Sequence, residues 1–326
     1  MGAASRAAVC PIRPRPRPPP GRTVAAVTTT RIDGAALDAA EQFVLRTARL
    51  IDRHRFAHRF RGGPAAAVIA ALRPYANDDG GFGHALEPDL RGAASQPEPV
   101  EVALRILAET DGGAGLHDPM VGGACDWLAA VSAPDGGVPW VLPSVVDDPR
   151  GPWWQPEPGA PGALVPTASI VGLLHSHGVA HRWLDGATAF CRARVDAIVG
   201  QGRELEPYTA RAILDLLDGV PDRGWAEAAF ADVRAQILAT VTFDPDTPGH
   251  VHLPIEFAPT PDGFGRRLFT DEVMGEHLDL LAAGQRDDGG WGFNWEAWAP
   301  ATVAEWRGHV TVERLALLRA HGRWDA

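Results

Sequence analysis

Apolar residues recur at helical spacing from Ala35 onward, and Gly, Pro and Asp separate the resulting segments. Almost no stretch alternates between apolar and polar residues as a half-buried strand would. Several segments begin with proline, which suits a first helical turn because its missing N–H is not needed there. The pattern predicts an all-α chain, with helices over 35–53, 64–75, 97–110, 120–131, 166–175, 184–199, 207–217, 226–240, 270–284 and 306–321.

Some of these segments are more apolar around their circumference than the others. The runs 100–104, 170–174 and 213–217 each follow a proline-containing start and contain few polar residues. Helices that are apolar on most sides are buried on most sides. We therefore expect these to form an inner ring, with the preceding helices outside it.

A short phrase with two glycines recurs between predicted helices. Its aspartates stand at 79, 135 and 288, so the intervals are 56 and 153 residues, the second about three times 50. The longer interval leaves room for two degenerate units. A period near 50 residues is typical of stacked helical hairpins or of a closed ring of them. The repeat predicts a single α/α toroid of about five helical hairpins, with inner and outer rings.

The phrase has a structural explanation. Two glycines supply the positive φ or the close backbone approach of a tight turn, and an aspartate accepts hydrogen bonds from freed N–H groups. The aromatic residue that follows in two copies, Phe82 or Trp291, can fill the gap between hairpins. We interpret Asp79 and Asp288, with the neighbouring Asp78 and Asp287, as turn residues.

Residues 1–30 are rich in proline and arginine and show no apolar periodicity, which predicts a disordered tail before a toroid domain over 31–326. The tail lacks the apolar core of a signal peptide, and no apolar run is long enough to span a membrane. Cys10, Cys125 and Cys191 are widely spaced, which fits neither a disulfide framework nor a zinc cluster. These features favour a cytoplasmic protein.

The net charge of the chain indicates which classes of partner it can bind. The chain has 30 basic and 41 acidic residues, with a formal net charge of -11. A net negative charge disfavours broad nucleic-acid binding. We therefore do not expect nucleic acid as a partner, and the composition does not indicate an oligomeric state.

The segment 280–292, Leu-Leu-Ala-Ala-Gly-Gln-Arg-Asp-Asp-Gly-Gly-Trp-Gly, resembles the squalene-cyclase repeat. Over about residues 65–321 the chain is similar to the terpenoid-cyclase and protein-prenyltransferase α/α toroids, although Asn77 and Phe82 replace the Gln and Trp of the repeat at its first site. The resemblance implies a central cavity for an apolar, isoprenoid-like small molecule. Segments 81–89 and 305–311 also resemble a group of bacterial proteins of uncharacterised function.

The signature residues of the three activities in that superfamily are missing. The sequence has no Asp-x-Asp-Asp for protonating an alkene, no Asp-Asp-x-x-Asp for magnesium and no Asp-x-Cys for zinc. The nearest acidic runs are 147–148 and 244–246. Whether the protein is an enzyme therefore stays open, and we expect neither a cofactor nor a metal. Histidines at 54 and 58, at 175, 177 and 181, and at 250 and 252 have no ligand at a specific spacing to complete a metal site.

Candidate catalytic carboxylates lie between an outer and an inner helix. Glu87 and Asp89 precede Glu98 and Glu101, which stand on the first turn of a predicted inner helix. Such a loop should sit at the mouth of a toroid, where paired carboxylates can act as general acid and base. The structural alternative is that Glu101 pairs with Arg105 at i,i+4 and that Glu98 only complements the helix dipole.

The segment 305–313 is the second candidate. We assign His309 to proton transfer near neutral pH and Trp306 and Arg307 to substrate binding. The alternative is that Trp306 packs in the core and that Arg307 pairs with an acid.

Aromatic walls form the third candidate. We assign Trp153, Trp154 and Trp295 to binding a polyprenyl chain or a carbocation by cation–π attraction. Tryptophans beside glycine-rich turns also serve as packing residues.

Three functions fit these observations. The first is a prenyltransferase-like or terpene-cyclase-like protein with acid–base chemistry at a central cavity. The second is a carbohydrate-active hydrolase or lyase, which needs two carboxyl groups facing each other across a groove. The third is a non-catalytic binding or scaffold module. Convergence of the loops at 84–101 and 303–313 on one cavity would support the candidate acids as active-site residues, and separation would argue against them.

Overall fold

The computed structural model describes residues 29–202 and 204–326, so the predicted disordered tail over 1–30 lies almost entirely outside the described residues. Within these ranges the chain forms α-helices, short 3-10 helices and isolated β-bridges, but no strand. None of the described helices is both long and apolar enough to cross a membrane. The predicted all-α class is confirmed.

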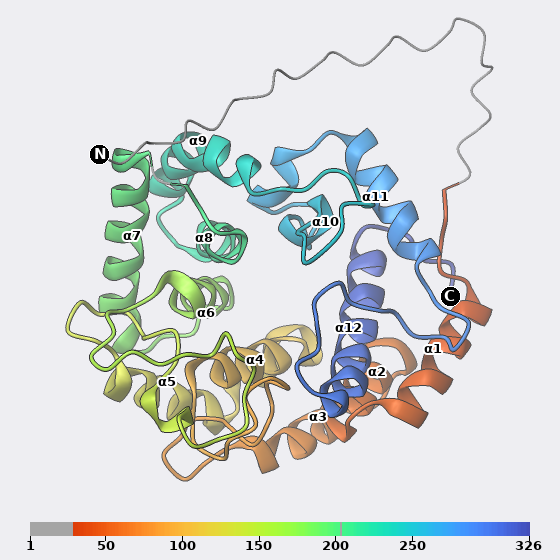
Figure 1. The fold of residues 1–326 in the computed structure, drawn as a ribbon, viewed down its shortest axis with the longest axis horizontal. Coiled ribbons are helices and arrows are strands. Elements are labelled where there is room, and N and C mark those ends of the chain that lie inside the picture. The colour runs from red at the N-terminus through yellow and green to blue at the C-terminus, as the bar shows by residue number, and fades with distance from the viewer. Residues whose placement is uncertain (1–28, 203) are drawn as a thin grey trace, which may run out of the picture.

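The helices alternate between an outer and an inner ring (Figure 1). The outer ring consists of α1 (Gly34–Thr47), α3 (Ala65–Leu72), α5 (Pro119–Val131), α7 (Trp183–Gln201), α9 (Arg223–Ala239) and α11 (Asp271–Ala283). The inner ring consists of α2 (Leu50–Arg61), α4 (Pro97–Ala108), α6 (Leu164–Ser176), α8 (Pro207–Gly219), α10 (Pro254–Phe257) and α12 (Pro300–Ala320). The α/α toroid is confirmed.

The described residues form six outer–inner pairs, where the repeat predicted about five. The segment predicted as one helix over 35–53 is two helices, because Ala48 and Arg49 adopt extended backbone conformations. Hydrophobic periodicity does not reveal the part of α2 after residue 53, because the core-facing positions of this helix include the charged residues Asp52 and Arg55. The four-residue α10 is too short for any periodicity to show.

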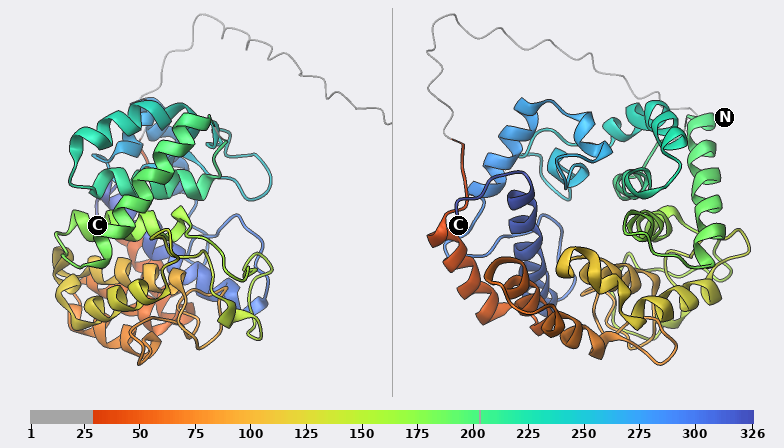
Figure 2. Two further views of the ribbon diagram at one scale, coloured as in Figure 1. Left: turned by 90° about the vertical axis from the view of Figure 1, so that its left-hand side faces the viewer. Right: turned by 180° about the vertical axis from the view of Figure 1, so that it is seen from behind.

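The ring closes where the two ends of the domain meet. Helix α12 packs against both α1 and α2 (Figure 2). The Ile32 N–H donates to the Arg323 carbonyl at 3.1 Å, and the Asp325 N–H donates to the Ile32 carbonyl at 2.8 Å. The termini of the domain are therefore tied together, and the array is a closed ring rather than an open solenoid.

The three glycine-rich phrases form the same turn. In each, the backbone N–H of the first residue of the phrase donates a hydrogen bond to the carbonyl of the second glycine. In the first phrase this bond runs from the Asn77 N–H to the Gly81 carbonyl at 2.9 Å. The first glycines have φ near +90°, and a Cβ on Gly289 would lie 2.1 Å from the Ala39 carbonyl of α1. Gly80 and Gly136 approach α5 and α7 in the same way. Each turn thus packs on the next outer helix, and the last one closes the ring.

The aspartates and aromatics of the phrase are structural, as predicted. Asp79 accepts from the Gly81 N–H at 2.9 Å and from the Trp127 indole at 3.1 Å. Trp291 is fully buried, and its indole N–H donates to the Leu281 carbonyl at 2.8 Å. Phe82 and Val138 occupy the same buried position in the other two turns.

The long connections gather on one side of the ring, which we call the loop face (Figure 2, left). These connections, 132–163, 240–253 and 284–299, each lead from an outer helix to an inner one, as does 73–96. The N-termini of the inner helices therefore open on the loop face. The connections on the opposite side, the back face, are mostly short.

Candidate functional site

The acidic loop at 84–91 is held from both sides. Arg49 donates to the Leu86 carbonyl at 2.8 Å and also to the Ala85 carbonyl. On the other side, the Gly151 N–H donates to the Asp89 carbonyl at 2.9 Å, and Leu90 packs with Trp154 in a small separate core. The loop is therefore fixed to α2 and to the 132–163 connection, which places its carboxyl groups at the loop face.

Four predicted carboxyl groups come together there. Glu87, Asp89 and Glu101 are 6%, 3% and 6% exposed, and Glu98 has one carboxyl oxygen buried without a hydrogen-bond partner among the described residues. Burial, followed by the charges of Glu101 and Glu87, raises the pKa of Glu98 well above its ordinary value. Burial and the adjacent Asp89 raise the pKa of Glu87 to about 8. Glu87 is therefore largely protonated at neutral pH, and the same influences favour the protonated form of Glu98.

The other two acids differ in their partners. Glu101 accepts from Arg105 at 2.7 Å, as the i,i+4 spacing predicts, although burial still raises its pKa. Burial also raises the pKa of Asp89, against the opposing effect of the Trp306 and Trp298 indole groups. One Asp89 oxygen and both indole nitrogens lack a partner within hydrogen-bond distance, so these groups approach each other without a formed bond.

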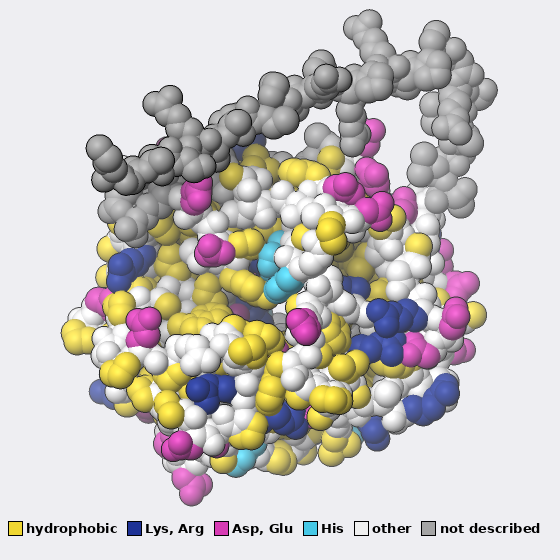
Figure 3. Space-filling model, viewed as in Figure 1, with side chains coloured by type: hydrophobic (Ala, Val, Ile, Leu, Met, Phe, Trp, Pro, Cys, Tyr) yellow, Lys and Arg dark blue, Asp and Glu magenta, His cyan; other side chains and the backbone are white. Residues whose placement is uncertain are grey.

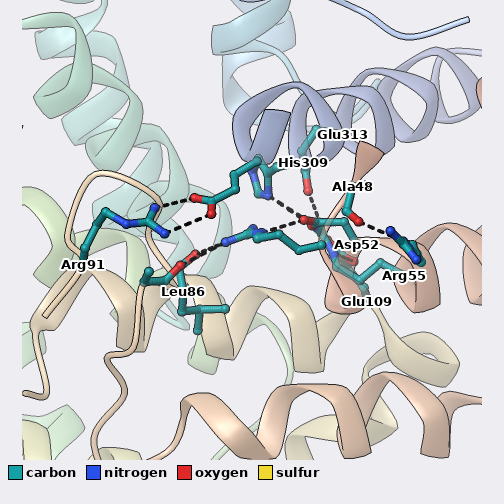
Figure 4. Close-up of polar contacts among 12 residues, drawn as sticks. Ala48, Asp52, Arg55, Leu86, Arg91, Glu109, His309 and Glu313 are labelled. Atoms are coloured by element: carbon teal, nitrogen blue, oxygen red, sulfur yellow. Dashed lines mark hydrogen bonds and ion pairs between the residues drawn. The ribbon is translucent and has the colours of Figure 1, made fainter. Parts of the chain in front are cut away.

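The loop at 303–313 meets the acidic loop. Arg91 binds Glu305 through two hydrogen bonds, of 2.6 and 3.1 Å (Figure 4). Together with the approach of Trp306 to Asp89, this contact joins the start of α12 to the loop before α4. The two segments that the sequence singled out therefore lie on the same part of the ring.

A stripe of polar residues on α8 faces the ring centre. Tyr208, Arg211, Asp215 and Asp218 are its more exposed positions at spacings of three and four residues, while the rest of the helix is largely buried. Arg105 of α4 donates to Asp215 at 2.6 Å, although its own side chain is 43% exposed. Outer helices cover the other side of α4 and α8, so this exposure is toward the ring centre. The sequence predicted inner helices that are apolar around most of their circumference, and α4 and α8 depart from this along their polar stripes.

Aromatic rings and histidines form a continuous arc of ring contacts. Figure 3 shows histidine and hydrophobic side chains beside the hollow of the loop face. His250 lies between Tyr208 and Trp295, with ring centroids 5.9 and 5.7 Å away. Trp295 stands edge-on to Trp306 at 5.1 Å, and Trp306 in turn to His309 at 5.7 Å. Trp295 and Trp306 therefore contact each other, and Trp306 approaches Asp89. Their role in substrate binding stays a prediction.

A buried ion-pair network lies deeper, where α2, α4 and α12 meet (Figure 4). Arg55 is 1% exposed and donates to Glu109 at 2.6 Å, to Asp52 at 3.1 Å and to Glu313. Arg49 binds Asp52 at 2.8 Å from the other side. Buried charges persist only when they are paired in this way. The network joins three inner helices.

His309 belongs to the edge of this network. Its Nδ1 lies 3.0 Å from an Arg55 nitrogen, which can only donate, so Nδ1 accepts. Burial and the Arg55 charge lower the pKa of His309 to about 4. The ring is therefore neutral at pH 7, so the structure does not support the predicted proton transfer by an imidazolium near neutral pH.

Three predicted binding residues do not face the ring centre. Arg307 binds Asp288 at 2.7 and 2.8 Å and lies 4.5 Å over the Phe43 ring, so it fastens the closing turn to α1. Trp154 is 4% exposed and stacks on Trp140 at 4.5 Å, which makes it a packing residue under the acidic loop. Trp153 is 44% exposed at the surface. Arg307 and Trp154 therefore hold neighbouring segments together, and Trp153 is a surface residue.

The sequence missed several residues of the site. Tyr208 and Arg211 were not singled out, although their spacing with Asp215 is a signal for a polar stripe. The pairs of Arg55 with Glu109 and Glu313 gave no local signal, because they join distant segments, whereas Asp52 pairs with Arg55 at i,i+3. Within the described residues, no three metal-ligating side chains are grouped for a metal ion.

A separate pocket of about 440 Å³ opens on the back face. It is lined by the C-terminal halves of α6 and α8, including Ser169 and Asp215, and by the 259–267 segment. Asp215 contacts both this pocket and Arg105, so the α8 stripe extends from the loop face to the back face.

Comparisons with known proteins complete the description. No family model matches the chain, and no curated protein matches it in sequence. Among solved structures it is similar to the type II terpene cyclase MstE from Scytonema, at 11% identity and a TM-score of 0.49 over 89% of this chain and 98% of that one. A variant of that enzyme in complex with geranylgeranyl dihydroxybenzoate matches at 12% identity and a TM-score of 0.47 over 89% of this chain and 97% of that one. These structures come from the superfamily that the repeat resembles, but at such values they assign no substrate, reaction or site residue to this chain.

Proposed function

We propose that this protein is an acid–base enzyme of the terpenoid-cyclase type. It binds a largely apolar, unsaturated small molecule at the ring centre and protonates it from the acidic loop and the start of α4. The observation that supports the proposal is a group of carboxyl groups whose pKa values are raised by burial, Glu87, Asp89 and Glu98. Within this group Asp89 approaches the Trp306 indole, which stands edge-on to Trp295.

Glu98 is the proton donor in this proposal. Its unpartnered oxygen is buried on the first turn of an inner helix, and burial together with the charges of Glu101 and Glu87 raises its pKa, which favours the protonated acid. The π electrons of a carbon–carbon double bond take the proton to form a C–H bond, the neighbouring carbon becomes a cation, and Glu98 becomes a carboxylate. Loss of a proton from the cation restores the acid. The faces of Trp295 and Trp306 stabilise the cation in between.

The other predicted residues have supporting roles. Asp89 sits beside the Trp306 indole and adds to the charge that disfavours ionisation of Glu87. His309 presents a neutral ring next to Trp306. The carbohydrate-active alternative is less well supported, because the carboxyl groups with raised pKa at the loop face come from one segment, 87–101, rather than from two sides of a groove.

The test is conversion of polyenes in heavy water. Purified protein is incubated in D₂O with squalene, oxidosqualene or geranylgeraniol, and products are identified by mass spectrometry. We expect an isomer of one substrate that carries a single deuterium at the protonated carbon. Glu98→Gln should lower its rate about 100-fold or more without changing the ligand-induced rise in melting temperature.

The matched control is Glu157→Gln, because Glu157 is exposed in the 132–163 connection. It should convert substrate at the wild-type rate. An unchanged rate in Glu98→Gln would exclude this residue as the donor. If no polyene is converted and none raises the melting temperature, the non-catalytic alternative replaces the proposal.

A further inference from the structure

The pocket on the back face has no role in the proposed function. Its volume of about 440 Å³ lies between the C-terminal halves of α6 and α8, the start of α9 and the 259–267 segment. Neither the proposed proton donor Glu98 nor the aromatic arc lines it. Ligand sites commonly have volumes of about 300–1,000 Å³, so this pocket is large enough for a small organic molecule.

Helices α6 and α8 meet backbone to backbone beside this pocket. A Cβ on Gly172 would collide with the Asp215 carbonyl, and one on Gly219 would collide with the Gly172 carbonyl. Only glycine permits such a close approach. The contact brings Ser169, one turn before Gly172, to the same pocket wall as the acidic positions of α8.

Ser169 lines the pocket with an unused hydroxyl group. The residue is 5% exposed, yet its side chain forms no hydrogen bond with any described residue. Buried hydroxyl groups are normally hydrogen-bonded, and a hydroxyl can both donate and accept. The free hydroxyl of Ser169 therefore indicates that a polar group of a ligand can bind here.

Asp218 presents a free carboxylate oxygen to the same pocket. Its Oδ1 accepts from the Phe264 N–H at 2.7 Å, whereas its Oδ2 has no hydrogen bond or ion pair with a described residue. Burial, followed by the charges of Asp215 and Asp262, raises the pKa of Asp218 to about 6. The Asp262 side chain also has no ion pair among the described residues. Two acids of the pocket therefore lack a counter-charge.

The arginines of the pocket are occupied elsewhere. Arg267 binds Glu227 through two hydrogen bonds, of 2.9 and 3.0 Å. Arg223 donates to carbonyls at the end of α8, including that of Leu217 at 2.6 Å. Both guanidinium groups lie over the Phe264 ring, 4.7 and 5.0 Å from its centroid. The C-terminal ends of α6 and α8 add partial negative charge, so the pocket favours a cation.

We infer that the back-face pocket binds a small organic amine, whose ammonium group contacts Asp218, Asp262 and the Ser169 hydroxyl. An ammonium group donates three hydrogen bonds, which matches these three acceptors. Leu173 and Pro259 give the carbon chain an apolar contact. A metal ion fits less well, because no three metal-ligating side chains are grouped anywhere in the described part of the chain. The inference does not depend on the proposed function, since it concerns another cavity.

Binding of 1,4-diaminobutane tests the inference. Its affinity for the full chain is measured by calorimetry and compared with that of 1,4-butanediol, which has the same carbon chain but no charge. We expect wild type to bind the diamine at least about 10-fold more tightly. Asp218→Asn, which keeps an oxygen for the Phe264 N–H, should weaken diamine binding by about 10-fold, and Ser169→Ala by about 5-fold.

Asp232→Asn is the matched control, because Asp232 is exposed on α9 and does not line the pocket. It should bind the diamine as wild type does. Asp262→Asn covers the case that Asp218→Asn does not fold, since Asp262 is exposed and its side chain forms no bond within the described part of the chain. This variant should also weaken binding. In a second measurement, the diamine should raise the melting temperature more than magnesium chloride or sodium chloride at equal ionic strength.

The contrary outcomes are distinct. Equal affinities for diamine and diol, or an affinity that is unchanged in Asp262→Asn and Ser169→Ala, would overturn the amine site. Stabilisation by magnesium chloride as large as that by the diamine would also overturn it and would indicate an inorganic cation. Glu98→Gln should bind the diamine as wild type does, so loss of polyene conversion in that variant concerns the proposed function alone.

Discussion

Replacing Glu87 by glutamine tests whether the Glu87 carboxyl group is protonated in the folded protein at neutral pH. Glutamine has the same shape but cannot ionise, so it removes only the charge that the folded state disfavours. Burial and Asp89 raise the pKa of Glu87 from an ordinary value of 4.5 to about 8. Each difference of one between the folded and unfolded pKa values corresponds to about 1.4 kcal/mol, so the full difference amounts to about 5 kcal/mol at most.

The sign follows from proton binding. Because the folded pKa is raised, the folded state holds a proton that the unfolded chain releases between pH 4.5 and pH 8. The stabilisation from this group is complete below pH 4.5 and is lost as the pH rises to 8. Wild type should therefore lose about 3 kcal/mol from Glu87 between pH 5.5 and pH 7.5, and Glu87→Gln should not.

Urea unfolding followed by tryptophan fluorescence measures this difference. The free energy of unfolding of Glu87→Gln minus that of wild type should be near zero at pH 4.5, rise with pH and level off above pH 8. The exposed Glu157→Gln serves as control and should give a flat difference. A flat difference for Glu87→Gln as well would mean that Glu87 is ionised in the folded protein at neutral pH, which would refute the reasoning.

Two further predictions concern the ring itself. Arg55→Met leaves Asp52 and Glu109 without their buried cation and should lower the free energy of unfolding by about 3–5 kcal/mol, whereas Arg182→Gln, which breaks the exposed pair with Asp126, should cost about 1 kcal/mol or less. Gly289→Ala forces a side chain into a backbone with φ of +91° and against α1, and should cost about 2 kcal/mol or more in urea unfolding. Gly186→Ala meets no atom within 4 Å on α7 and should be neutral or slightly stabilising. Equal effects of the two changes within either comparison would contradict the structural reason given for it.

The repeat could be predicted from the sequence because its determinants are local. Asp79, two glycines and Phe82 are neighbours in the chain, and their turn is made from their own backbone groups. The same holds for the pairing of Glu101 with Arg105, which lie one helical turn apart. Interactions within one turn leave a pattern that a sequence displays directly.

The roles of the tryptophans and of Arg307 depend on distant segments. Trp154 is a packing residue because Trp140 and Leu90 happen to reach it. Arg307 is occupied because Asp288, 19 residues earlier, lies on the turn that closes the ring. The sequence pattern is the same whether such a side chain faces a cavity or a neighbouring helix. Only the packing of distant segments determines which of the two roles, binding or packing, the side chain has.

The inner helices show how the ring makes its centre polar. Helices α4 and α8 bury their apolar positions against outer helices, which leaves Glu98, Arg105 and Arg211 toward the centre. In an ordinary two-layer packing such a polar stripe would indicate a surface helix. A closed ring has a second, inner surface. In this ring the same stripe therefore lines the centre, where the proposed chemistry takes place.

Charged side chains are paired in the buried network around Arg55, whereas some polar and charged groups at the loop face have no partner among the described residues. The deep network balances its charges, since Arg55 is paired with Asp52, Glu109 and Glu313 and further arginines complete the set. The loop face does not: a buried Glu98 oxygen has no partner, and Arg211, whose charge reaches it, forms no ion pair with it. A sequence selected for stability alone would bring such groups into contact or replace them by apolar residues. A buried carboxyl group without a partner on this wall is the arrangement that the proposed proton donor, Glu98, requires.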